Sequence, residues 1–153
     1  MRISAKVDYA IRAMVELATA ADTGKPVKGE RVATAQEIPL KFLENILLDL
    51  RHGGLVASQR GVEGGYWLAR PAAEIRLADV IRAVEGPIAS VRGTRPGKIE
   101  YKGSAEPLED VWLALRAALR SVLEGVTLAD VASGTLPQAI RDLAASPDAL
   151  DPR

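Results

Sequence analysis

The chain contains no cysteine and a single histidine among its 153 residues. One histidine and no thiol leave few groups for acid–base or nucleophilic catalysis. The sequence also lacks a phosphate-binding loop, a dinucleotide fingerprint and any set of residues at metal-ligand spacing. We therefore expect a protein that is not an enzyme and that binds no metal.

Long hydrophobic runs and an excess of charge of one sign are also missing. No segment is long and apolar enough to span a membrane, and the first residues lead into an amphipathic segment rather than a secretion signal. With the absence of cysteine, this predicts a cytoplasmic protein without a membrane partner. The 20 basic and 20 acidic residues cancel, so any nucleic-acid binding needs a local basic patch rather than bulk charge.

The clearest pattern lies in residues 38–70, which read IPLKFLENILLDLRHGGLVASQRGVEGGYWLAR. Apolar residues recur at helical spacing over residues 39–52, and a Gly-Gly pair then ends the helix. Two short strands, residues 55–58 and 65–69, flank a glycine-rich tip that carries Arg60. A helix that fits the DNA major groove, followed by such a hairpin, indicates a winged helix-turn-helix.

The rest of the chain predicts a mainly α-helical protein with this small β-wing. Further helices are expected at residues 4–21, 28–36 and 77–85. Glycine, proline and basic residues dominate the loop that follows, and the C-terminal residues are rich in Ala, Pro, Asp and Gly. The expected organisation is a winged helix-turn-helix domain at 1–87, a loop at 88–104, a dimerisation helix with its cap at 105–133, and a flexible tail at 134–153.

The longest predicted helix, residues 106–124, carries apolar residues at alternating steps of about three and four. A small winged-helix domain has little area with which to cover this stripe, so we expect a second copy of the chain to cover it. Trp112 is expected in the dimer core rather than in a ligand site. The residues predicted to make the dimer contact are Leu108, Val111, Trp112, Leu115, Leu119 and Val122.

Four segments, in the right order, resemble the Rrf2 family of bacterial winged-helix regulators. They read MRISAKVDYAIRAMVELA, IPLKFLENILLDLRHGGLV, RGVEGGYWLARP and ADVIRAVEGPI. The resemblance is dense over residues 1–87 and looser over the long helix and residues 127–130. It implies a homodimeric DNA-binding transcriptional regulator, more often a repressor, that presents two recognition helices to a partly palindromic operator.

The resemblance also implies which residues contact double-stranded DNA. Lys41 and Glu44 lie where the family's recognition helix reaches base edges, and Arg60 lies where members place an arginine in the minor groove. Pro39 replaces a hydroxyl residue of some members, so base preference is expected to differ. Taken alone, each of these charged residues could simply be solvated. The full set predicted to contact DNA is Ser4, Lys28, Pro39, Lys41, Glu44, Asn45, His52, Arg60 and Gly61.

The chain departs from the family's sensor members in the loop before the long helix. Those members hold an iron–sulfur cluster through cysteines there, and residues 90–104 contain none. Asp8 matches a carboxylate ligand of some relatives, but one carboxylate cannot hold a cluster. We therefore expect no cofactor, and an effector that is a small molecule, a protein or absent. The basic residues of this loop, Arg92, Arg95, Lys98 and Lys102, favour a solvated linker over an anionic-effector pocket or an added phosphate contact.

A protein-interaction module is the competing hypothesis. In this case the winged helix or the long helix would bind a partner enzyme, and DNA binding would be lost. The net charge of zero and the acidic residues Glu44, Asp49 and Glu63 near the expected reading surface keep this second hypothesis open. Salt-dependent DNA affinity distinguishes the two hypotheses.

Overall fold

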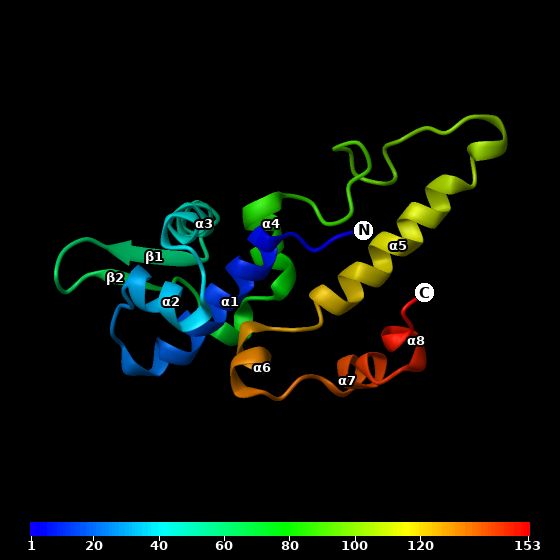
Figure 1. Cartoon of the computed structure of the whole chain (residues 1–153). Coiled ribbons are helices and arrows are strands. Elements are labelled where there is room, and N and C mark those ends of the chain that lie inside the picture. Colours follow the sequence, from blue (N-terminus) through cyan, green and yellow to red (C-terminus); the bar gives the residue numbers. More distant parts are fainter.

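The computed structural model describes residues 1–153 and is mainly helical, with one two-stranded sheet (Figure 1). Helix α1 (Ala5–Ala20) is the central element, and α2 (Gly29–Gln36), α3 (Leu40–His52) and α4 (Leu77–Glu85) pack around it. Ser4 caps α1, because its Oγ accepts a hydrogen bond from the Val7 amide at 3.1 Å. The apolar stripe of α1 is buried at Val7, Ala10, Ala13, Met14 and Leu17.

The turn between α2 and α3 sets the direction of α3. Glu37 adopts the left-handed conformation, with φ of 52°, and the Ile38 amide donates to the Ala33 carbonyl at 2.9 Å. Pro39 was expected inside the first turn of α3 but lies just before it, at the N-cap, so the helix begins at Leu40. The predicted apolar face of α3 is fully buried, and the polar face therefore points outward.

The wing consists of β1 (Val56–Gln59) and β2 (Gly65–Leu68), paired antiparallel with Val56 opposite Leu68. Both strands lie within one residue of their predicted limits. The segment before α2 joins the sheet, since Val27 and Tyr66 exchange two backbone hydrogen bonds at 2.8 Å. Gly65 has φ of 146°, and a Cβ there would lie 2.6 Å from the Val27 carbonyl oxygen. Only glycine fits this contact.

Helix α5 (Leu108–Leu123) projects away from the winged-helix body (Figure 1), and none of its residues is buried. The chain then returns, and α6 (Leu128–Ser133) packs against α1. The Leu128 amide donates to the Ile75 carbonyl at 2.9 Å, and the Leu128 side chain is fully buried in the main core. Helix α6 is thus part of the body, although the sequence analysis grouped it with α5.

Residues 134–153 were expected to form a flexible tail, but the structure places two short helices there, α7 (Gln138–Ala144) and α8 (Pro147–Leu150). Gln138 and Asp142 join successive turns of α7 through a 2.6 Å side-chain hydrogen bond. Pro147 suits the first turn of α8, where no backbone donor is needed. Neither helix buries a residue, so local features rather than core packing define them.

None of the helices in the chain combines the length and the hydrophobicity that are needed to span a membrane.

Candidate nucleic-acid interface

A groove of about 490 Å³ lies between α3, the wing and the N-terminal end of α2. Most of its lining is polar. Three cationic side chains and two carboxylates face it: Lys28, Arg51, Arg60, Glu30 and Glu44. The groove therefore carries charges of both signs with a small positive excess, on a chain whose formal net charge is zero.

The wing tip is tied to α2 at one side of this groove. Lys28 lies at the N-cap of α2, and its Nζ donates to the Gly61 carbonyl at 2.6 Å. Gly61 has φ of 101°, which favours glycine, and its carbonyl also accepts from the Gly64 amide at 3.0 Å. These contacts fix the turn that presents Arg60, whose own side chain makes no ion pair.

Arg51 is a groove residue that the sequence analysis did not select. Its Nη1 donates to the Ser58 hydroxyl at 3.1 Å and so links α3 to β1. Arg51 follows Glu44 by seven residues, close to two helical turns, so both side chains lie on one face. The seven-residue spacing from Glu44 therefore indicates that Arg51 lies on the DNA-facing side of the helix. The sequence prediction included the neighbouring His52 instead, because of its position at the helix C-terminus.

Five of the nine residues predicted to contact DNA line the groove together: Lys28, Glu44, Asn45, Arg60 and Gly61. Lys41 and His52 are exposed on α3 but lie outside the groove, and Pro39 precedes the helix. The Ser4 hydroxyl caps α1 and donates to the Glu85 carboxylate, far from the wing in sequence. The groove therefore gathers only part of the predicted set.

Two leucines of α3 are exposed at the groove. Leu40 and Leu48 retain 37% and 41% of their accessible surface, and both line the groove. Partly exposed leucines are common on protein surfaces, so they do not identify a site by themselves. They suit contact with apolar groups such as thymine methyls, which the DNA major groove displays.

The residues of the predicted dimer stripe on α5 differ in their exposure and contacts. Val111 is 53% exposed, and Ala114 and Ala118 on the same face of α5 are also exposed. Trp112 instead turns toward its own chain, where its Nε1 donates to the Tyr101 hydroxyl at 3.0 Å. The remaining stripe residues, Leu108, Leu115, Leu119 and Val122, are half-buried.

Glu124 joins the end of α5 to α4. Its carboxylate accepts from Arg120 at 2.8 Å and also pairs with Arg82 of α4. Hydrogen bonds from Arg120 and then Arg82 lower the pKa of Glu124 to about 2. The carboxylate is consequently ionised throughout the neutral range and holds two arginines at the base of the projecting helix.

The chain offers no set of ligands for a metal cluster. No three His, Cys, Asp or Glu side chains come together anywhere in it. The Asp8 carboxylate is held by Arg12, which pairs with it at 2.9 Å. Since cluster iron takes cysteine thiolates and the chain has none, its residues do not fit an iron–sulfur cluster.

The sequence matches known proteins over most of its length. Residues 3–134 match the family model described as "Rrf2: Iron-dependent Transcriptional regulator". The Mycobacterium tuberculosis protein Rv1287 is 57% identical over 144 residues, which cover 94% of this chain and 89% of that protein. The HTH-type transcriptional regulator CymR of Bacillus subtilis is 36% identical over 136 residues, covering 88% and 92% of the two chains.

Solved structures give the same result. The B. subtilis CymR structure, described as that of a global cysteine regulator, has a TM-score of 0.73 and 34% identity, covering 88% of this chain and 98% of that one. The structure of IscR from T. potens has a TM-score of 0.68 and 29% identity over 100% of this chain and 93% of that one. The predicted fold class, mainly helical with a β-wing, is confirmed.

Proposed function

We propose that this chain, which belongs to the Rrf2 family of DNA-binding transcriptional regulators, acts as a homodimeric repressor at a partly palindromic operator. The proteins of this family are named as regulators rather than enzymes. In this proposal the protein works on the chromosome in the cytoplasm. Each copy reads one half of the operator through α3 and the wing.

The observation that carries the proposal is the groove between α3 and the wing. It brings together Arg51, Arg60 and Lys28 as cations for phosphates, and Glu44 and Asn45 as groups for base edges. Phosphate contacts position a protein on DNA, and base contacts give specificity. The groove offers both kinds of group on one outward-facing surface.

The exposed face of α5 supports the homodimer. Val111, Ala114 and Ala118 form an apolar strip on a helix that buries no residue within its own chain. A second copy of α5 laid against this strip removes it from water. Two recognition helices would then be held at a fixed separation, which a two-fold symmetric operator requires.

We infer that the protein regulates without an iron–sulfur cluster, although the family model describes iron-dependent members. The support is chemical, because the chain has no cysteine and no cluster of three candidate ligands. Any signal must then reach the protein as a small molecule or as a protein partner.

The proposal is tested by DNA selection with the purified chain, followed by titration of the enriched duplex at several salt concentrations. We expect the enriched duplex to bind far more tightly than a scrambled one, with an affinity that falls steeply as salt rises. Equal affinity for the two duplexes would contradict specific reading. No measurable DNA affinity, with capture of a partner enzyme instead, would favour the competing interaction-module hypothesis.

A further inference from the structure

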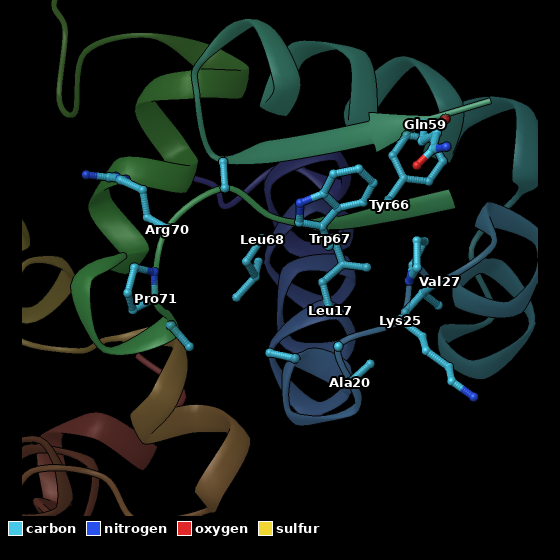
Figure 2. A pocket seen from close by; sticks show the side chains of 15 residues that line it. Leu17, Ala20, Lys25, Val27, Gln59, Tyr66, Trp67, Leu68, Arg70 and Pro71 are labelled. Carbon is cyan, nitrogen blue, oxygen red and sulfur yellow. The ribbon is translucent and has the colours of Figure 1, made fainter. Parts of the chain in front are cut away.

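A second cavity, of about 570 Å³, lies between strand β2 and the C-terminal end of α1 (Figure 2). It shares Gln59 and Tyr66 with the groove between α3 and the wing but is otherwise lined by different residues, and residues 24–27 form one of its sides. Figure 2 shows Leu17, Val27 and Leu68 lining the cavity below the wing strands, beside the ring of Trp67. Its volume falls in the range of roughly 300–1,000 Å³ that small-molecule sites occupy.

The charged side chains around this cavity are all cationic. Lys25 and Arg70 are the two charged residues of its lining, and no carboxylate lines it; in Figure 2 both side chains extend outward, away from the middle of the cavity. Lys25 makes no ion pair, and Arg70 only approaches Asp79, at 3.8 Å. Asp79 already approaches Arg70, so Lys25, which is exposed and unpaired, is the cation available to an anionic group at the mouth of the cavity.

Polar groups without partners also line the cavity. The Trp67 indole N–H and the Gln59 side-chain amide make no hydrogen bond with the rest of the chain, although both residues line the cavity. Trp67 is 37% exposed, which is high for a large aromatic side chain. A few polar donors around an otherwise apolar cavity are typical of a ligand site.

We propose that this cavity binds a small organic carboxylate with an aromatic or branched aliphatic body. The apolar body packs against Leu17, Leu68 and the Trp67 ring, and the carboxylate lies at the cavity mouth and pairs with Lys25, whose exposed side chain turns inward to meet it. Such charge-assisted bonds add affinity and orient the ligand. The proposal names a class of effector for a regulator whose residues do not fit an iron–sulfur cluster.

Binding here would reach the DNA groove through the wing, a step that rests on the proposed function. Gln59 and Tyr66 line both cavities. Val27 lines the carboxylate cavity and holds Tyr66 through two backbone hydrogen bonds of 2.8 Å. A ligand against Val27 and Trp67 would therefore shift β2, which pairs with β1 and ends the wing turn that carries Arg60. DNA affinity then changes if the two wing positions bind DNA differently.

Binding is tested without DNA, so that it does not depend on the proposed function. The chain has two tryptophans, so Trp112→Phe leaves Trp67 as the only indole reporter. Phenylacetate and 4-methylpentanoate are titrated into this variant by fluorescence and calorimetry, with phenylacetamide and 4-methylpentanamide as neutral controls. We expect saturable binding of at least one carboxylate and much weaker binding of its amide.

Two further variants, with a third as control, test where the carboxylate binds. Lys25→Met should weaken carboxylate binding by about tenfold or more, because it removes the ion pair, whereas Lys98→Met in the distant loop should not. Ala20→Leu puts a larger side chain into the cavity and should also abolish binding, with the fold checked by circular dichroism. No saturable signal with either carboxylate, or binding that survives both substitutions, would overturn the site.

The regulatory step is tested by measuring operator affinity with and without a saturating carboxylate. We expect a change of several-fold in the wild-type protein and none in Lys25→Met. Carboxylate binding that leaves operator affinity unchanged would overturn the regulatory role. A protein that binds the carboxylate but no DNA would instead overturn the proposed function.

Discussion

Arg60 is the residue on which wing recognition depends most directly. It lies at the tip held by the Lys28–Gly61 hydrogen bond and has no acidic partner within the chain. Its guanidinium is thus free to bind a phosphate or enter the minor groove. Arginine is well suited to this role, since its charge is permanent and its donors form a planar fork.

Replacing Arg60 with alanine should weaken operator binding and reduce its salt dependence. Loss of one phosphate contact per wing lowers the slope of log affinity against log salt by about one per wing. Fluorescence anisotropy at several salt concentrations measures both effects. Arg92→Ala, in the loop outside the groove, serves as the matched control. Equal slopes for the Arg60 variant and the wild type would exclude the contact.

Glu44 should determine base preference rather than overall affinity. A carboxylate near DNA is repelled by phosphates unless it accepts a hydrogen bond, as from a cytosine amino group. Glu44→Ala is therefore expected to relax preference at one operator position by roughly 1–3 kcal/mol. Competition among duplexes that differ at single positions measures this. An unchanged ratio between cognate and scrambled duplexes would show that Glu44 reads no base.

Residue-level prediction from the sequence was limited by helix rotation. Successive residues of a helix are turned by about 100°, so neighbouring residues face different surroundings. The sequence prediction placed His52 and Lys41 at the DNA contact. Neither residue lines the groove, whereas Arg51, which was not predicted, does. The wing was easier to predict, because a residue at the tip of a short hairpin, such as Arg60, can hardly be buried in the core.

At the level of elements, apolar periodicity predicted most of the fold. Helix α4 has its predicted bounds, and α3 buries its predicted stripe. The sequence could not place α6 in the body, because the contact between Leu128 and the core spans more than a hundred residues of chain. Trp112 was missed for a different reason, because its partner Tyr101 lies in a loop without regular structure, where no periodicity indicates which way a side chain points.

The junction between α4 and α5 should depend on the ionised Glu124. Its pKa is about 2, below its ordinary value, so its stabilising effect is present above about pH 4.5 and is lost as pH falls toward 2. Glu124→Gln should lower the melting temperature at pH 7, and the difference from wild type should shrink between pH 4.5 and 2.

Thermal melts of both proteins across this pH range measure the difference, which isolates Glu124 from the other carboxylates. Asp151→Asn provides a control, because Asp151 pairs only with Arg153 at the C-terminus. A melting difference between Glu124→Gln and wild type that stays constant from pH 7 to 2 would show that the charge of Glu124 does not stabilise the junction.

At the scale of the whole molecule, α5 is a long helix that buries no residue within its own chain. It projects from the body and leaves Val111 and Ala118 in water. A charge on this strip should prevent association, because a dimer contact would bury it without a partner. We expect Val111→Asp and Ala118→Asp to be monomeric, folded, and weak in operator binding.

Sedimentation equilibrium gives the oligomeric state of each variant, and circular dichroism confirms the fold. Ala73→Asp, exposed on the body and outside α5, is the control that should remain dimeric. Dimers of both α5 variants with unchanged affinity would place the contact between copies elsewhere on the surface.

The central claim is that two copies present their α3–wing grooves to one face of a DNA duplex. Hydroxyl-radical footprinting of the selected operator, with the stoichiometry of the complex measured by sedimentation, tests it most directly. We predict two bound chains and two protected segments, related by approximate two-fold symmetry and separated by one helical turn of about 34–36 Å or a multiple of it. One bound chain with a single protected segment would contradict the account.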